Sequence, residues 1–189
     1  MEIIGLGGSN GSGKDTVGEM LAERHGYLFV SVSDLLRDEL KRRGLPIERE
    51  HLRNLSAEWR RESGLGVLVK KAIELYEQQK GRYRGIVMAS LRNPGEADEI
   101  HAHGGTLIWV DADPKVRYDR VFSRQRTAED SKTFEQFLAE EQAEMQYSGD
   151  EATLNMSAVK ERADITIFNN GTDIEAFKDQ TETTLGLHK

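Results

Sequence analysis

The chain has 189 residues, no cysteine and a formal net charge of −7 at pH 7. This length suits a single domain with a substantial core, and a charged fraction of 31% suits an ordinary soluble protein. The lack of cysteine excludes disulfides and thiolate metal sites, while the negative balance argues against a general nucleic-acid-binding protein.

The apolar stretches of the sequence are short. The longest, residues 85–91 and 106–110, have the length of strands, whereas a membrane span needs about 20 residues. The first apolar run begins almost at the first residue, so we expect no targeting segment, no membrane association and a cytoplasmic location. The sequence leaves the oligomeric state open between a monomer and a homodimer.

Apolar runs alternate with stretches of helical periodicity along the chain. The predicted strands are residues 2–6, 27–32, 85–89, 106–110 and 165–168. The predicted helices are residues 14–24, 33–43, 48–61, 67–79, 95–102, 114–124, 134–145 and 173–185. This order predicts an α/β three-layer sandwich, in which a parallel five-stranded sheet carries helices on both faces. Ligands of such sheets bind at the carboxyl ends of the strands.

A glycine-rich loop follows the first predicted strand. Glycines at positions 8, 11 and 13 let backbone N–H groups turn toward a phosphate chain, and the helix that starts near Lys14 adds its positive end. The spacing matches the Walker A pattern G-x-x-x-x-G-K, with Asp15 and then Thr16 in place of an immediate Ser or Thr. A simple glycine-rich turn is the alternative. We predict that ATP is bound by Gly8, Asn10, Gly11, Ser12, Gly13, Lys14, Asp15 and Thr16.

Two helical insertions interrupt the alternation of what we expect to be one domain over residues 1–189. Residues 33–80 place three helices between the second and third strands, and residues 124–147 place a polar loop and a helix between the fourth and fifth. Because the sheet itself only positions phosphates, substrate selectivity is expected in these insertions.

The order of these parts resembles the P-loop nucleoside monophosphate kinases over nearly the whole chain. Gly-Lys-Asp-Thr at residues 13–16 is similar to the loop of phage-type deoxynucleotide kinases, and Ser-Asp-Leu-Leu-Arg at 33–37 resembles the segment that opens their monophosphate-binding region. Ser-Leu-Arg at 90–92 is similar to the end of the family's Asp-Gly-x-x-Arg signature. The order is also similar to adenylate-kinase-like and dephospho-coenzyme A kinase-like proteins.

This resemblance implies ATP and Mg²⁺ as cofactors, an acceptor-binding role for residues 33–80 and a lid formed by residues 124–147. Arg117, Arg120 and Arg124, with Arg126, resemble the lead into an arginine-bearing lid. Residues 163–172 resemble the last strand and turn, which would place Asn169 and Gly171 beside the ATP base.

Arginine is the residue best suited to hold an acceptor phosphate, because its guanidinium binds two oxygens at once. Arg37 lies one turn into the helix after the second strand, and Arg92 lies just past the third strand. We therefore expect both arginines to bind the substrate at the edge of the sheet where ligands lie. Arg92 is expected to act in catalysis as well, and Asp34 is a further substrate-binding candidate. Solvated arginines are the alternative.

Further charges are predicted from helical spacing. Arg117, Arg120 and Arg124 share one helical face, which could close over the donor phosphates. Of these, Arg120 and Arg124 are catalytic candidates, as is Lys14 of the loop. A solvated charge stripe is the alternative. In the first insertion, Arg53, Arg60 and Arg61 are interpreted as charges on a helix surface.

Asp15 and Asp34 are the carboxylates expected to meet Mg²⁺, which prefers one or two carboxylates together with phosphate oxygens and water. Asp34 could instead cap its helix.

Two departures from the family pattern concern catalysis. Ala89 stands where the family has an acidic residue, and residues 134–145 contain no arginine but two adjacent glutamates, Glu140 and Glu141. We expect Asp15 and Asp34 with Lys160 or Arg162 to compensate, or catalysis to be slow.

The leading hypothesis is an ATP- and Mg²⁺-dependent kinase that phosphorylates a nucleoside or deoxynucleoside monophosphate. Its partners would then be small nucleotides. A dephospho-coenzyme A kinase-like enzyme is one alternative, although its hydroxyl acceptor would need a general base. The other is a catalytically impaired, ATP-binding switch protein.

Overall fold

The computed structural model describes residues 1–79, 81–124, 132–145 and 149–187, with the side chain of residue 124 left out. Its strands are β1 (Glu2–Gly7), β2 (Leu28–Ser31), β3 (Gly85–Ala89), β4 (Thr106–Asp111) and β5 (Ile165–Phe168). Its helices are α1 (Lys14–His25), α2 (Val32–Arg42), α3 (Arg49–Ser63), α4 (Val67–Glu77), α5 (Pro94–Ala102), α6 (Pro114–Arg124), α7 (Phe134–Met145), α8 (Met156–Glu161) and α9 (Ile174–Thr184).

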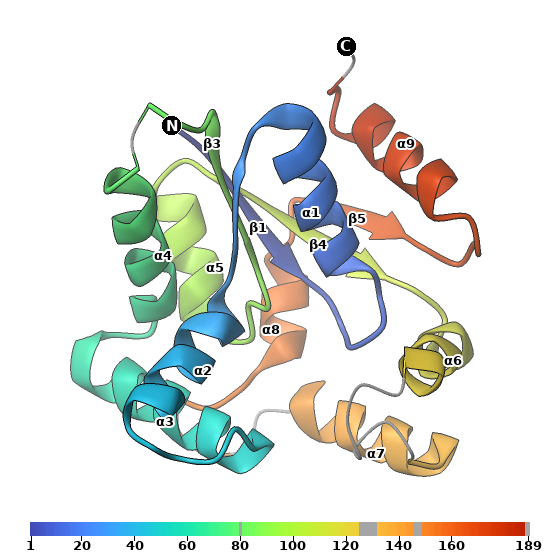
Figure 1. Cartoon of the computed structure of the whole chain (residues 1–189). Coiled ribbons are helices and arrows are strands. Elements are labelled where there is room, and N and C mark those ends of the chain that lie inside the picture. The colour runs from blue at the N-terminus through green and yellow to red at the C-terminus, as the bar shows by residue number, and fades with distance from the viewer. Residues whose placement is uncertain (80, 125–131, 146–148, 188–189) are drawn as a thin grey trace.

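The strands form one parallel sheet in the order β2-β3-β1-β4-β5. In register, Ile4 of β1 lies beside Val87 of β3, and Leu6 of β1 lies beside Ile108 of β4. Every residue of β3 is buried, as expected of a parallel strand that is covered on both faces. The predicted α/β fold with a five-stranded parallel sheet is therefore confirmed (Figure 1).

Helices cover both faces of the sheet and give the molecule its three layers (Figure 1). On one face, Val17 and Leu21 of α1 pack with Leu6, Ile108 and Phe177 in one apolar cluster. On the other face, the second cluster joins side chains of α4, α5 and α8 to Met88, Leu107 and Trp109.

The predicted strands and helices all occur, with ends shifted by no more than about two residues, a usual uncertainty of helix and strand boundaries. The sequence interpretation missed α8, whose six residues are too few to display a helical period. Asn155 begins this helix by accepting a hydrogen bond from the backbone N–H of Ala158 at 3.1 Å.

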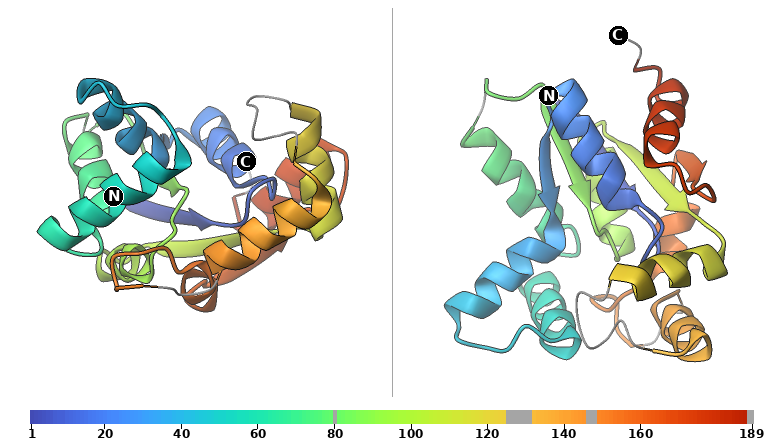
Figure 2. Two further views of the ribbon diagram at one scale, coloured as in Figure 1. Left: turned by 90° about the horizontal axis from the view of Figure 1, so that it is seen from below. Right: turned by 45° about the vertical axis from the view of Figure 1, so that its right-hand side comes forward.

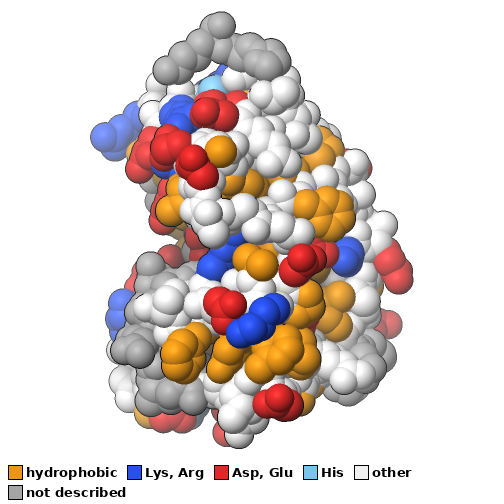
Figure 3. Space-filling view, turned by 90° about the vertical axis from the view of Figure 1, so that its right-hand side faces the viewer, with side chains coloured by type: hydrophobic (Ala, Val, Ile, Leu, Met, Phe, Trp, Pro, Cys, Tyr) orange, Lys and Arg blue, Asp and Glu red, His pale blue; other side chains and the backbone are white. Residues whose placement is uncertain are grey.

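The carboxyl ends of the strands carry the two insertions. Seen from that end, α3, α6 and α7 surround the turn between β1 and α1 (Figure 2). Figure 3 shows the side that bears α6, α7 and α9, where apolar and charged side chains are interspersed and a hollow separates the upper and lower parts. Among the described helices, none is both long and apolar enough to cross a membrane.

A buried ion pair joins the first insertion to the core. Arg60 of α3 is 3% exposed and Glu96 of α5 is 0% exposed, and their Nη2 and Oε1 atoms lie 2.6 Å apart. Arg60 also donates to the carbonyl of Ala152 at 2.9 Å and to the hydroxyl of Ser56 at 3.2 Å. The prediction that Arg60 is a surface charge is therefore wrong, whereas Arg61 is exposed and paired with the exposed Asp150, as predicted.

The same glutamate fixes the loop after β3. Oε2 of Glu96 accepts the backbone N–H groups of Arg92 at 2.7 Å and of Asn93 at 3.2 Å. The Asn93 side chain is fully buried and caps α5, while its amide donates to the carbonyls of Glu151 and Thr153 at 2.8 Å. One carboxylate therefore connects α3, α5 and the loop that carries Arg92.

Replacing Arg60 with Ala should lower the free energy of unfolding by about 3–5 kcal/mol, because it leaves the buried Glu96 charge without its partner. Urea denaturation measures this loss. Arg61→Ala removes an exposed ion pair one residue away and should change stability by less than about 1 kcal/mol. Similar effects of the two substitutions would contradict a structural role for the buried pair.

Candidate active site

The turn between β1 and α1 has the backbone of a phosphate-binding loop. Gly8, Gly11 and Gly13 have φ values of +147°, +80° and +101°, in the region that favours glycine. A Cβ at Gly8 would lie 2.4 Å from the carbonyl oxygen of Val110, and one at Gly11 would lie 2.6 Å from that of Arg117. Lys14 is the first residue of α1 and is 7% exposed. These glycines are required both by the backbone angles and by the closeness of β4 and α6.

Two side chains hold the carbonyl groups of this loop. Asn169, just after β5, donates to the carbonyl of Ser12 at 2.9 Å. Arg120 of α6 donates to the carbonyl of Gly11 at 3.3 Å, to Oδ1 of Asn169 at 3.2 Å and to the carbonyl of Gly171 at 2.6 Å. The structure therefore brings the predicted ATP-site residues Asn169, Gly171 and Arg120 together at the loop.

The expected stripe of lid arginines on α6 is not a single solvent-facing surface. Arg117 is 3% exposed, donates to the carbonyl of Ala112 at 2.7 Å and pairs with Glu141 of α7, Nη2 to Oε1, at 2.8 Å. Burial lowers the pKa of Arg117, and the nearby charges of Asp111 and Asp113 oppose that change. Arg117 therefore ties α6 to α7, which corrects the prediction for this residue. The side chain of Arg124 and all of Arg126 lie outside the described residues.

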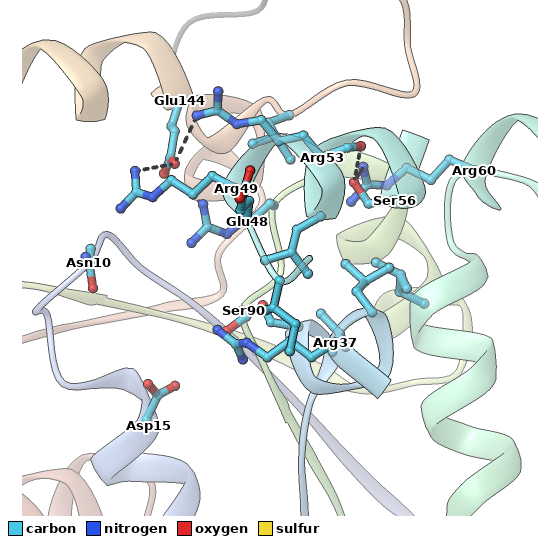
Figure 4. A pocket seen from close by; sticks show the side chains of 18 of the residues that line it. Asn10, Asp15, Arg37, Glu48, Arg49, Arg53, Ser56, Arg60, Ser90 and Glu144 are labelled. Carbon is cyan, nitrogen blue, oxygen red and sulfur yellow. Dashed lines mark hydrogen bonds and ion pairs between the residues drawn. The ribbon is translucent and has the colours of Figure 1, made fainter. Parts of the chain in front are cut away.

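A cavity of about 590 Å³ opens beside the loop (Figure 4). Residues from the loop, from α2 and α3, from the end of β3 and from α6 and α7 line it. They are Asn10, Asp15, Val32, Ser33, Leu36, Arg37, Ile47, Glu48, Arg49, Leu52, Arg53, Ser56, Arg60, Leu68, Ser90, Arg92, Val121, Glu144 and Leu154.

Arginines from three segments converge on this cavity. Arg37 comes from α2, Arg49 and Arg53 come from α3, and Arg92 follows β3. Arg37 and Arg92 are at the predicted edge of the sheet. Arg53 lines the cavity as well, with a side chain that is 48% exposed, in agreement with its interpretation as a charge on the helix surface, and Arg49 was missed. Their spacing of four residues on one helix is the signal that could have identified the pair.

Glu144 of α7 lies among these arginines, with a side chain that is 13% exposed. Its carboxylate is 2.8 Å from Nη1 of Arg92, 3.5 Å from Nη2 of Arg53 and 3.7 Å from Nη1 of Arg49. Burial raises the pKa of Glu144, but the three arginines outweigh burial and hold that pKa below its usual value.

Besides Glu144, two further glutamates of α7 have basic partners. Glu140 pairs with Arg49 at 3.0 Å and with Lys132 at 2.5 Å, and Glu141 pairs with Arg117. The lack of arginine on this helix, noted in the sequence, is thus accompanied by arginines that approach it from α3 and α6.

The two candidate metal ligands, Asp15 and Asp34, have different surroundings. Asp15 is exposed and lines the cavity, whereas Asp34 lies on the exposed side of the first turn of α2 and pairs with Arg37 at 2.6 Å. The described residues contain no group of three His, Asp or Glu side chains suited to a metal ion. Mg²⁺ requires only one or two carboxylates when phosphates supply further oxygens, so Asp15 fits such an ion. Thr16 lies in the first turn of α1.

The end of β3 carries serine instead of an acid. Ala89 is fully buried, and Ser90 lines the cavity with a φ of +70°, a conformation that non-glycine residues seldom adopt. Lys160 pairs with Asp111 at 2.8 Å and Arg162 pairs with Asp98 at 2.7 Å. Neither lines the cavity, and compensation by one of them, with slow catalysis as the alternative, stays a prediction.

The sheet and the phosphate-loop turn have a P-loop kinase-like fold. A family model described as an AAA domain matches residues 4–147. The shikimate kinase of Bacteroides thetaiotaomicron superposes with a TM-score of 0.60 and 14% identity over 97% of this chain and 98% of that one. The shikimate kinase of Acinetobacter baumannii gives a TM-score of 0.54 and 17% identity over 98% and 91%. At such identities the similarity establishes a shared fold.

Sequence similarity then gives the family. The UPF0200 protein of Pyrobaculum aerophilum is 32% identical over 184 residues, which cover 95% of this chain and 94% of that protein. The UPF0200 protein of Pyrococcus horikoshii is 30% identical over 174 residues, covering 90% and 89%. The chain belongs to the UPF0200 family.

Asn169→Ala should weaken ATP binding about tenfold, since a hydrogen bond to a buried carbonyl is worth about 1–3 kcal/mol and this one fixes the loop. Titration with a fluorescent ATP analogue measures the change in Kd. The matched control is Asn170→Ala, because Asn170 accepts the exposed N–H of Asp113 and does not contact the loop. Equal Kd values for the two variants would show that Asn169 does not set the loop for the nucleotide.

Proposed function

We propose that this protein transfers the γ-phosphate of ATP to a nucleoside or deoxynucleoside monophosphate. The observation that carries the proposal is the convergence of arginines on a cavity that Asn10 and Asp15 of the phosphate loop also line. A monophosphate carries close to two negative charges at neutral pH, and guanidinium groups bind its oxygens in pairs.

On the donor side, the loop amides and Lys14 would hold the phosphate chain of ATP. The positive end of α1 adds to their attraction for negative charge. Asn169 and Gly171, which are linked to the loop through Arg120, are the candidates to line the base.

On the acceptor side, Arg37 and Arg92 would hold the monophosphate. The cavity offers apolar side chains for the nucleoside, among them Leu36, Leu52 and Leu68. Its volume of about 590 Å³ lies within the range of small-molecule sites.

A bound Mg²⁺ would neutralise charge on the donor phosphates, and Asp15 would hold it, with Asp34 as a second candidate. Transfer also requires the acceptor phosphate to be positioned in line with the γ-phosphate of ATP, and the arginines and the loop would position the two groups. A phosphate oxygen is already a nucleophile and needs no general base. Ala89 and Ser90 offer none at the end of β3, which favours a phosphate acceptor over the hydroxyl of a dephospho-coenzyme A-like acceptor.

The second insertion is proposed as the lid that excludes water from the transfer. Its described part, α7, contributes Glu144 to the cavity and is joined to α6 through Glu141 and Arg117. The polar loop at residues 125–131 lies outside the described part of the chain.

Lys14→Ala should abolish phosphoryl transfer, because it removes the mobile charge at the terminal phosphates of ATP. The assay offers Mg-ATP with a panel of ribo- and deoxynucleoside monophosphates and dephospho-coenzyme A. We expect one monophosphate to yield a diphosphate with the unchanged protein only.

If only dephospho-coenzyme A is phosphorylated, the proposed monophosphate acceptor is wrong and the protein is a kinase of the dephospho-coenzyme A type. If ATP binds and no acceptor is phosphorylated, the kinase proposal fails and the nucleotide switch stands.

Arg37→Gln and Arg92→Gln should each raise the KM for the acceptor roughly 10- to 100-fold, as expected when a charged hydrogen bond worth about 1.5–3 kcal/mol is lost. The KM for ATP should change less than about threefold, because neither arginine belongs to the phosphate loop. Steady-state kinetics separate the two constants. Arg61→Gln, on the surface of α3, is the control. An effect on the KM for ATP alone would place these arginines on the donor side.

A further inference from the structure

The arginine cluster of the cavity holds an anion that belongs to the protein itself. Figure 4 shows the carboxylate of Glu144, from α7, with ion pairs to Arg49 and Arg53, and Arg92 is the third arginine that contacts it. These arginines are attached to α3 and to the loop after β3, whereas Glu144 lies 52 residues beyond Arg92 in the chain. The contacts of Glu144 with Arg49, Arg53 and Arg92 therefore join α7 to α3 and to the loop after β3.

The three contacts of Glu144 differ in length. Only the contact to Arg92, at 2.8 Å, has hydrogen-bond length, while those to Arg53 and Arg49 are 3.5 and 3.7 Å. One carboxylate thus faces three guanidinium groups. Glu140 gives Arg49 a further partner at 3.0 Å, and Glu48 also lines the cavity.

A phosphate group suits this position better than a carboxylate. It has more acceptor oxygens and carries up to two charges, and arginine forks bind both kinds of anion. We propose that Arg49, Arg53 and Arg92 form the site for the phosphate of the acceptor, and that Glu144 occupies this site until the acceptor displaces it. This inference rests on the proposed function, and it adds Arg49 and Arg53 to the acceptor site.

Displacement of Glu144 by the acceptor would couple acceptor binding to the contacts of the second insertion. Glu144 is part of α7, so an incoming phosphate breaks the contacts that join the end of this helix to α3 and Arg92. Because the carboxylate and the phosphate compete for the same groups, Glu144 lowers the affinity for the acceptor by the free energy of its own contacts. Acceptor binding and the release of Glu144 from the arginines are then the same event.

A purely structural role for Glu144 predicts the opposite sign. If the carboxylate only holds the arginines in place for the ligand, its removal should weaken the binding of anions. If it competes, its removal should strengthen that binding. The sign of the effect therefore decides between the two roles.

The test is calorimetric titration with inorganic phosphate, carried out in the full chain with Lys14→Ala, so that the phosphate loop contributes little. Adding Glu144→Gln should lower the Kd for phosphate about tenfold. Adding Arg53→Gln as well should remove this gain. Glu135→Gln makes the same charge change at an exposed position of α7 and should leave the Kd unchanged.

Unchanged or weaker phosphate binding with Glu144→Gln would overturn the proposal, as would an equal gain with Glu135→Gln. Thermal unfolding of each variant checks that it is folded. Glu144→Asp, which keeps the charge on a shorter side chain, provides a second variant, with an expected Kd between those of the parent and Glu144→Gln.

The titration needs neither ATP nor a nucleotide acceptor, so the two proposals can fail separately. Tighter phosphate binding with no phosphorylated acceptor would support the arginine site and reject the kinase. Phosphorylation of a monophosphate with no change caused by Glu144→Gln would support the kinase and reject the competing role of Glu144.

Discussion

The cavity depends on the buried contact between Arg60 and Glu96. Charges removed from water are stable only when paired and hydrogen-bonded, and here the partners include backbone groups of the loop after β3. Arg60 belongs to the same helix as Arg49 and Arg53, and Glu96 fixes the backbone of Arg92. This buried ion pair, whose Arg60 also lines the cavity, thus sets the positions of three further arginines there.

Charge is distributed unevenly in this acidic protein. The net charge is −7, yet Arg37, Arg49, Arg53 and Arg92 gather in one cavity. Phe134 and Phe137 of α7 pack against Tyr118 of α6. Glutamates of the same helix add electrostatic contacts to the arginine cluster and to Arg117. Such contacts exchange partners more readily than an apolar interface, because an anionic ligand can replace a carboxylate without opening a core.

The sequence is informative where local rules act. Glycine spacing locates the phosphate loop, apolar runs locate the strands, and position after a strand places Arg37 and Arg92 at the cavity. Side-chain burial is harder to predict, because Arg60 is buried by a partner 36 residues away. For the same reason Arg117 and Arg120 share a helical face but bind different groups, Glu141 in one case and the loop carbonyls in the other. The role of Glu144 depends on three arginines that become neighbours only in the folded chain.

The bonds from Asn169 and Arg120 reach the carbonyl oxygens of the phosphate loop and therefore do not use its amides. The chain entropy lost in shaping this loop is therefore lost during folding, before any nucleotide arrives. A ligand that meets a preorganised loop gives up less of its binding free energy to ordering the protein, so more of it is available to discriminate among phosphate chains. In this molecule the loop held by Asn169 and Arg120 lies beside a cavity whose arginines make ionic contacts.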